Sequence, residues 1–507
     1  MALSNSDFQD MQGLLRFGYA RLTEACFLLL KIEDAHAVGL WLETAPLSTA
    51  EVQNPPPSRA LQLAFTFQGL QKLGLGDAVL NGFSAEFIAG MTADENRSRR
   101  LGDTGQSAPQ YWEWGRPDDL PDLVAMIYAK PDEFEAWKGT LESGLTQAGI
   151  KLLRCLPTTD MQGVEPFGFV DGVSQPQPDW EGRRSVADDK MTYENIAMLG
   201  EFVLGYPNEY GKYTDRPTLA EQVDADLPNA EDQPGYKDIG RNGTYLVLRQ
   251  LEQDVHSLWR SADQHANGDA AKRQDLLEKM VGRRMSGDPL LPIDPHGIAG
   301  IGSKAEDIQQ NQFTFVSDPD GTRCPLGAHI RRANPRNADF PADTKGLLAR
   351  FLRILGFGQK SMRDDMLAST RFHRLIRRGR EYGPKLEPEQ RLQPPQPNEP
   401  ASGLQFICLN ANIGRQFEFV QSAWLMSNKF DGLSDEDDPI LGSRESVSGC
   451  PIHKFSLPNP GHARQQISNL PRFVTVRGGA YFFMPGVRAL RYFARTARSE
   501  KTRGTHQ

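Results

Sequence analysis

Short apolar runs that resemble strands alternate along this chain with single helical patterns, and this alternation is the feature that most restricts its fold. In the first half, strand-like runs lie at 25–32, 122–130 and 150–156. Residues 59–75 carry apolar side chains at helical spacing, and residues 131–149 begin with Pro-Asp and end at a glycine, as helices do. This order predicts a βαββαβ ferredoxin-like unit in which one strand is not recognised.

The second half repeats the pattern. An amphipathic helix is expected at 413–426. Strand-like runs occur at 244–251, 403–410 and 480–485, the last after a turn expected at Gly478 and Gly479. No G-x-G-x-x-G turn joins a strand to a helix, so the alternation favours the α+β class over a doubly wound parallel sheet.

Charge and cysteine content exclude several classes of function. The net charge is −8, and the basic residues are spread along the chain, so nucleic acid is not expected as a partner. No apolar run approaches the roughly 20 residues of a membrane helix, and the N-terminus lacks the pattern of a signal peptide. Five scattered cysteines favour free thiols and a cytoplasmic location.

Four segments place polar side chains among apolar, glycine and proline residues. They are GFVDG with Asp171, CPLGAHIRRANPR with His329, HRLIRRG with Arg377 and DEDDPILG with Asp438. Each has an ordinary structural interpretation, respectively a turn, a solvated loop histidine, surface arginines at a helix end and an acidic loop. The alternative for His329 is a metal or haem-iron ligand whose neighbouring arginines meet anionic groups.

A zinc site is the less favoured interpretation of the cysteine and histidine residues. Cys324 precedes His329 by five positions, whereas Cys450 precedes His453 by three. Structural zinc sites use four ligands, usually in two close pairs with recurrent spacings, and these two spacings do not match that pattern.

Taken together and in this order, GFVDG, CPLGAHIRR and LIRRG resemble the motifs of the dye-decolorizing peroxidase (DyP-type) family of haem proteins. The segments DMQGLLRFGY, TYLVLRQLEQDV, GLQFICLNANIGRQFEFVQ and FVTVRGGAYFF extend the resemblance over most of the chain. The similarity is to the larger subgroup with long insertions, and a helix within 345–362 is expected to be one such insertion. The resemblance implies an α+β fold of two ferredoxin-like halves with antiparallel sheets and haem b (iron protoporphyrin IX) between them. We expect the halves at 1–160 and 241–507, with the GFVDG loop and a connecting excursion at 161–240.

The resemblance also implies roles for individual residues. His329 would be the proximal ligand of the haem iron, and Asp171 and Arg377 would be the catalytic residues on the distal side. Asp438 is the expected carboxylate partner of the proximal imidazole, although Asp437 adjoins it. The remaining haem-contacting residues implied are Leu404 and Phe406 on the distal haem face and Arg331 at a propionate.

The activity implied is that of a haem peroxidase, which uses hydrogen peroxide to oxidise phenols, aromatic dyes and similar one-electron donors through a ferryl intermediate. The alternative is a haem-binding, iron-handling protein with incidental peroxidase activity. The expected partners are therefore hydrogen peroxide and small aromatic reducing substrates, with no nucleic acid and no membrane. The sequence leaves open the physiological donor and the oligomeric state.

Overall fold

A computed structural model describes residues 3–184, 195–293, 310–311, 313–336, 369–446, 449, 451–459 and 461–503. The helix expected within 345–362 and Cys450 lie outside these residues. Within them, nine strands form one large sheet, in which β10, β12, β9, β15, β2, β3, β1 and β4 follow one another and β11 also pairs with β12. Every pairing in this sheet is antiparallel.

The first half has the predicted ferredoxin-like order. Its strands lie in the order β2-β3-β1-β4, with a helix after β1 and another after β3. The elements are β1 (Glu24–Ile32), α2 (Ala35–Thr44), β2 (Arg59–Phe65), β3 (Leu123–Ala129), α7 (Phe134–Gln147) and β4 (Ile150–Pro157). The three strand-like runs and the helix at 131–149 are therefore confirmed.

The helix expected over 59–75 is wrong for the first part of that range. Arg59–Phe65 forms β2, the strand that the sequence pattern missed, and only Phe67–Lys72 forms a helix, α3. Because β2 pairs with β3 on one side and meets β15 on the other, all but its first residue are buried. Only Thr66 separates β2 from α3, so the strand and the helix together resemble one apolar run with helical spacing.

The second half repeats the topology with the order β15-β9-β12-β10. Its elements are β9 (Thr244–Gln253), α8 (Val255–His265), β10 (Ile376–Arg377), β11 (Arg380–Tyr382), β12 (Gly403–Asn410), the π-helical segments η8 (Gly414–Glu418) and η9 (Val420–Leu425), and β15 (Val474–Met484). The strands at 244–251 and 403–410 and a helical segment at 413–426 are confirmed. The two half-sheets join where Phe483 of β15 pairs with Phe65 of β2.

Gly478 and Gly479 do not form the expected turn. They lie inside β15, where the pairing with β9 shifts register between Val476 and Gly478. Trp114 forms a β-bridge with Gly478, and a Cβ at Gly478 would clash with the indole ring of Trp114. The glycine therefore allows the chain before β3 to approach the strand closely.

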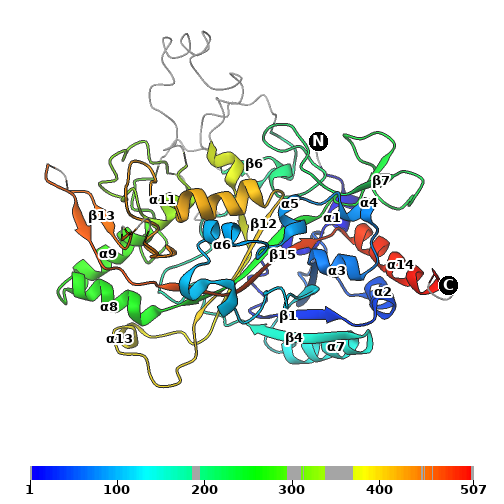
Figure 1. Ribbon diagram of the computed structural model, residues 1–507, viewed down its shortest axis with the longest axis horizontal. Coiled ribbons are helices and arrows are strands. Elements are labelled where there is room, and N and C mark those ends of the chain that lie inside the picture. Colours follow the sequence, from blue (N-terminus) through cyan, green and yellow to red (C-terminus); the bar gives the residue numbers. More distant parts are fainter. Residues whose placement is uncertain are drawn as a thin grey trace, which may run out of the picture.

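The longer helices of both halves pack against one face of the large sheet, where their side chains join a single apolar core. The C-terminal helix α14 (Val487–Arg503) packs beside α2 of the first half, while α8 and α9 (Ala270–Val281) lie at the other end of the molecule (Figure 1). The other α-helices are α1 (Asn5–Asp10), α4 (Asp77–Leu80), α5 (Ala85–Ala89), α6 (Glu95–Leu101), α11 (His329–Ala333) and α13 (Pro388–Arg391). Short 3₁₀ segments are η1 (Gly13–Leu15), η2 (Gly105–Ser107), η3 (Pro109–Tyr111), η4 (Leu199–Glu201) and η7 (Ser369–His373).

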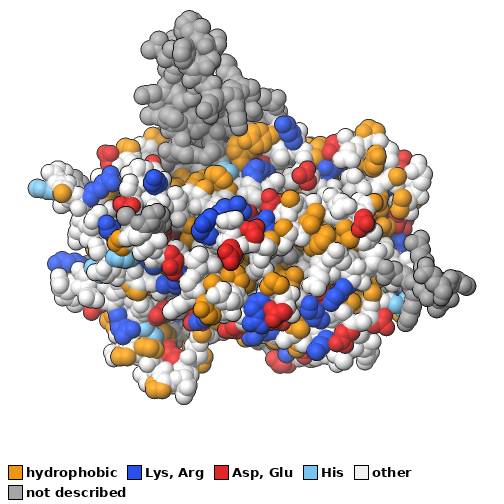
Figure 2. All heavy atoms as spheres, in the orientation of Figure 1, with side chains coloured by type: hydrophobic (Ala, Val, Ile, Leu, Met, Phe, Trp, Pro, Cys, Tyr) orange, Lys and Arg blue, Asp and Glu red, His pale blue; other side chains and the backbone are white. Residues whose placement is uncertain are grey.

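Among the described residues, three small two-stranded sheets lie outside the large one. They pair β5 (Gln177–Pro178) with β6 (Ile196–Ala197), β7 (Thr218–Ala220) with β8 (Tyr236–Asp238), and β13 (Phe455–Leu457) with β14 (Gln465–Ile467). Figure 2 shows acidic and basic side chains interspersed over the visible face of the molecule. No helix among the described residues combines the length and apolar character needed to cross a membrane.

Candidate active site

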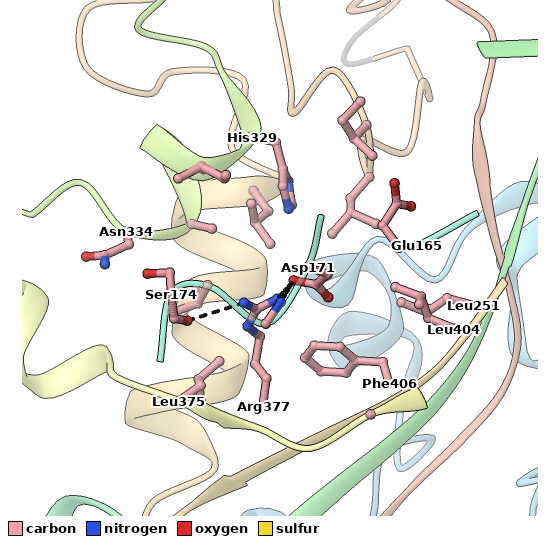
Figure 3. A pocket seen from close by; sticks show the side chains of 18 of the residues that line it. Glu165, Asp171, Ser174, Leu251, His329, Asn334, Leu375, Arg377, Leu404 and Phe406 are labelled. Atoms are coloured by element: carbon pink, nitrogen blue, oxygen red, sulfur yellow. Dashed lines mark hydrogen bonds and ion pairs between the residues drawn. The ribbon is translucent and has the colours of Figure 1, made fainter. Parts of the chain in front are cut away.

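A cavity of about 620 Å³ lies against the sheet of the second half. The GFVDG loop, α11, β10 and segment η9 contribute to its other walls. Strands β9, β12 and β15 line it with apolar side chains, namely Leu251, Leu404, Phe406, Val474 and Val476. The cavity brings together Asp171, His329, Arg377, Leu404 and Phe406, which the sequence analysis selected from segments far apart in the chain (Figure 3).

Asp171 is presented by a loop with a well-defined backbone. Its N–H donates to the carbonyl of Gly163, and the N–H of Val170 donates to the carbonyl of Met285, both at 3.0 Å. The N–H of Gly172 donates to Oδ1 of Asp171 at 2.6 Å. These bonds point the carboxylate into the cavity, where its side chain keeps 35% of its exposure.

Arg377 faces Asp171 in the cavity. Its Nη1 donates to Oδ1 of Asp171 at 2.8 Å, and its Nη2 donates to the carbonyl of Ser174 at 3.3 Å. Burial alone would raise the pKa of Asp171, but the charge of Arg377 and the hydrogen bonds from Gly172 and Arg377 hold it below its usual value. Asp171 is therefore a carboxylate at neutral pH.

The placement of Arg377 on a helix end is wrong, because Ile376–Arg377 is the short strand β10, paired with β12. The N–H of Arg377 donates to Oε1 of Gln175 at 3.0 Å, which fixes the backbone of Arg377 next to the loop that carries Asp171. Successive residues on a strand face opposite ways. Arg378 accordingly turns away from Asp171, and its Nε donates to the carbonyl of Leu14 at 2.9 Å.

His329, the first residue of α11, enters the cavity from another wall (Figure 3). Its Nδ1 is 2.9 Å from Oδ2 of Asp438, whose side chain is fully buried. The other carboxylate oxygen of Asp438 accepts the N–H groups of Ile440 and Leu441, both at 2.8 Å. Burial would lower the pKa of His329, but the charge of Asp438 raises it above its usual value.

The choice between Asp437 and Asp438 is settled by their contacts. Asp438 bonds to His329, whereas Asp437 forms an ion pair with Arg444 and also accepts the N–H of Arg444. The two adjacent carboxylates therefore have different partners, and Asp438 holds the imidazole.

Comparison with known proteins gives this arrangement a family. No family model matches the chain. The chain is 27% identical to Peroxidase 2 of Mycetinis scorodonius over 508 residues, which cover 95% of this chain and 86% of that protein. It is 29% identical to the multifunctional dye peroxidase DyP2 of Amycolatopsis sp. over 351 residues, which cover 66% of this chain and only 62% of that protein. The crystal structure of a fungal DyP-type peroxidase from Auricularia auricula-judae matches with a TM-score of 0.69 at 22% identity, over 97% of this chain and 99% of that chain. The chain is thus similar over nearly its whole length to dye-decolorizing peroxidases.

A further structural match comes from a dye-decolorizing peroxidase in complex with 2,6-dimethoxyphenol. The TM-score is 0.67 at 22% identity, over 96% of this chain and 99% of that chain. The two ferredoxin-like halves are therefore the fold of the dye-decolorizing peroxidases, as the motifs implied.

The implied haem b of a dye-decolorizing peroxidase fits the residues of the cavity. A macrocycle needs extended apolar walls and an axial nitrogen ligand. Because Nδ1 of His329 is bonded to Asp438, the ring has Nε2 left to act as the ligand inside an apolar cavity. Leu404 and Phe406, two residues apart on β12, both line that cavity, as expected from the alternation of a strand.

The structure does not bring Arg331 to the cavity, which contradicts the expectation of a propionate contact. Its Nη1 donates to the carbonyls of Asp318 and Cys324 at 3.0 and 2.9 Å, and its guanidinium lies 4.6 Å from the centre of the Phe315 ring. On the short helix α11, residue 331 is two positions after His329 and so points about 200° away from it. The Arg331 side chain is instead buried, and it bonds to the chain segment that precedes α11.

Sequence reasoning did not select Glu165, which is also a residue of the cavity. It lines the same cavity as Asp171 and stands six positions before it in the segment EPFGFVDG. A carboxylate that precedes an apolar, glycine-containing turn could have been noticed as a hydrogen-bond acceptor for that turn.

Proposed function

We propose that this protein is a haem peroxidase that uses hydrogen peroxide to oxidise phenols, aromatic dyes and similar one-electron donors. The observation that carries the proposal is the placement of two ion pairs around one apolar cavity. Asp171 bonds to Arg377 on one side, and His329 bonds to Asp438 on another.

The residues that would hold haem are His329, through Nε2, and the apolar side chains of β9 and β12, including Leu404 and Phe406. Bound haem would supply the iron that takes up peroxide and the electrons that reduce it. The chemistry of the protein itself then concerns the movement of one proton and the stabilisation of charge on oxygen.

Asp171 is suited to move that proton. Its carboxylate is ionised and faces the cavity, so it can accept a proton from hydrogen peroxide and deliver it to the oxygen that leaves as water. The loop hydrogen bonds at Asp171 and Val170 fix the backbone, so the carboxylate need not reorganise during the transfer.

Arg377 would stabilise the negative charge that develops on the departing oxygen. A guanidinium held at 2.8 Å from Asp171 is already oriented before peroxide enters. The same charge keeps Asp171 ionised and therefore ready to accept the proton.

Asp438 would orient His329 and strengthen it as a ligand. Its carboxylate accepts the Nδ1 proton of the ring, which leaves Nε2 as the basic nitrogen and makes the imidazole more electron-donating. The two backbone N–H groups that donate to its other oxygen hold Asp438 in place.

The reducing substrate is proposed as a small aromatic donor. A dye-decolorizing peroxidase with the same fold was solved with 2,6-dimethoxyphenol, and that compound is a suitable first donor.

The four cysteines among the described residues carry free thiols, which supports the cytoplasmic location that the cysteine pattern predicts.

The test is the visible absorption spectrum of the purified protein, supplemented with haem if needed, before and after one equivalent of hydrogen peroxide. We expect a haem band that changes on adding peroxide and is restored by 2,6-dimethoxyphenol. A haem band that does not change on adding peroxide would favour the iron-handling alternative. A protein that does not bind haem would overturn the proposal.

A further inference from the structure

Glu165 is a second carboxylate in the cavity, and the proposed proton transfer does not use it. Its side chain accepts three hydrogen bonds. Oε1 accepts the N–H of Phe169 at 2.9 Å, while Oε2 accepts the N–H of Phe167 at 3.0 Å and Nε2 of Gln253 at 2.8 Å. Two of these donors belong to the loop that carries Asp171, and the third belongs to β9.

Backbone hydrogen bonds also close the tight turn from Glu165 to Phe169. The N–H of Glu165 donates to the carbonyl of Phe169 at 2.9 Å, and the N–H of Gly168 donates to the carbonyl of Glu165 at 2.8 Å. Together with the two side-chain bonds, these contacts fix the backbone between Glu165 and Phe169. Asp171 follows two residues later, so its direction depends on this turn.

On its side away from the Glu165 carboxylate, the loop packs against Trp259 and Arg391. Trp259 of α8 donates its Nε1–H to the carbonyl of Phe167 at 2.9 Å, and Arg391 of α13 lies 5.1 Å from the centre of the Trp259 ring. Gly168 has a φ of +106°, and a Cβ there would clash with Nη1 of Arg391. The loop is therefore held between this packing and the acceptor oxygens of Glu165.

We propose that Glu165 is a positioning residue, whose ionised carboxylate holds the turn so that Asp171 faces Arg377. This inference rests on the proposed peroxidase function for its catalytic meaning, but the structural link from Glu165 to the loop stands independently of it.

The ionised form is the one that the surrounding donors require. A neutral acid would place its own O–H among three groups that already donate to it, so protonation would cost a hydrogen bond. Burial raises the pKa of Glu165 to about 7, the three hydrogen bonds oppose that rise, and the nearby charge of Asp171 adds to it. Arg391 is a further charged group near Glu165, and burial lowers the pKa of that guanidinium while the charge of Glu165 opposes the change. The anchor should therefore weaken as the pH falls through neutrality.

Hydrogen–deuterium exchange on the full-length protein tests the structural link directly. Glu165→Gln keeps only one acceptor oxygen, so the side chain cannot accept from Phe169 and from the pair Phe167 and Gln253 at the same time. We expect amide protection in peptides spanning 163–175 to fall by about tenfold or more in this variant, after correction for intrinsic rates. Glu399→Gln is the matched control, because Glu399 bonds to His256 away from the cavity and should leave the loop unchanged. Equal loop protection in wild type and Glu165→Gln would overturn the inference.

The pH profile of the peroxide-dependent spectral change gives a second, independent readout. We expect the wild-type rate to fall about tenfold or more below pH 7, while Glu165→Gln is slow throughout and lacks this inflection. Titration of Asp171 does not explain an inflection near 7, because its pKa is held below its usual value. An inflection that persists in Glu165→Gln would also overturn the inference.

If Glu165→Gln does not fold, Gln253→Leu serves instead. It removes the donor on β9, so the pKa of Glu165 should rise and the inflection should move to higher pH. An unmoved inflection would contradict the proposal. If the wild type shows no reaction with peroxide, the proposed function fails, whereas the exchange experiment still decides the role of Glu165.

Discussion

Arg377 and Asp171 stand 206 positions apart in the chain, and their side chains meet at 2.8 Å inside one cavity. The arginine comes from a two-residue strand at the end of the large sheet, and the aspartate comes from a glycine-containing loop. Their contact joins the group that would move the proton to the group that would stabilise the departing oxygen. The first two predictions follow from this pair.

Asp171→Asn should slow the reaction with hydrogen peroxide by about 10²- to 10⁴-fold, because the amide cannot accept the proton. Haem binding should be retained, since His329, the proposed ligand, is untouched. Stopped-flow spectroscopy after mixing with peroxide measures the rate, and a haem titration provides the control. An undiminished rate in this variant would assign the proton transfer to another group.

Arg377→Leu should move the acid limit of the peroxide reaction to higher pH. Without the guanidinium, burial raises the pKa of Asp171 against only the Gly172 hydrogen bond and the charge of His329, so the carboxylate becomes protonated at a higher pH. The wild type should therefore keep Asp171 ionised, and the reaction running, at a more acidic pH than the variant. The pH dependence of the stopped-flow rate measures this shift, and an unchanged acid limit would contradict the electrostatic role of Arg377.

His329→Ala should abolish or strongly weaken haem binding, because the cavity loses its axial nitrogen. His256→Ala is the matched control, since His256 bonds to Glu399 and is not among the residues that line the cavity. Haem titration followed by the visible spectrum distinguishes the two variants. Loss of haem in His256→Ala together with retention in His329→Ala would reverse the assignment.

Asp438→Asn and Asp437→Asn should behave differently although the residues are adjacent. Asp438 holds the imidazole, so its replacement should reduce haem affinity about tenfold to a hundredfold. Asp437 bonds to Arg444, so its replacement should affect the free energy of unfolding but leave haem affinity unchanged in the folded protein. Haem titration of both variants, each checked for folding by circular dichroism, decides between them. A loss of affinity confined to Asp437→Asn would show that the pairing is reversed.

Gly168→Ala should destabilise the protein more than Gly172→Ala. Both glycines have positive φ, +106° and +80°, so an alanine is strained at either position. Only at Gly168 would the new methyl group also clash with Arg391, whereas the space beside Gly172 is open. We expect a loss of about 2 to 4 kcal/mol in the free energy of unfolding for Gly168→Ala and about 1 to 2 kcal/mol for Gly172→Ala. Chemical denaturation measures both, and equal losses would show that Arg391 yields to the added methyl group.

The α+β class and most strands and helices could be predicted from the sequence, because apolar periodicity is written in neighbouring residues. The motifs around Asp171, His329 and Arg377 were recognisable for a related reason, since their chemistry depends on residue type and order. Strand β2 was missed because α3 follows it after one residue, Thr66, so strand and helix together resemble a single run with helical spacing.

Tertiary structure alone decided which side chains meet. Adjacent Asp437 and Asp438 cannot be told apart by type, and only their positions in the fold give one to Arg444 and the other to His329. Arg331 stands two residues from the proposed ligand, yet the rotation of α11 turns its side chain toward the carbonyls of Asp318 and Cys324. Two donors to Glu165 are backbone groups of its own loop, but the third, Gln253, reaches it only because β9 lies beside that loop. Residue types and their local period are properties of the sequence, whereas distances, partners and burial arise from contacts between residues far apart in the chain.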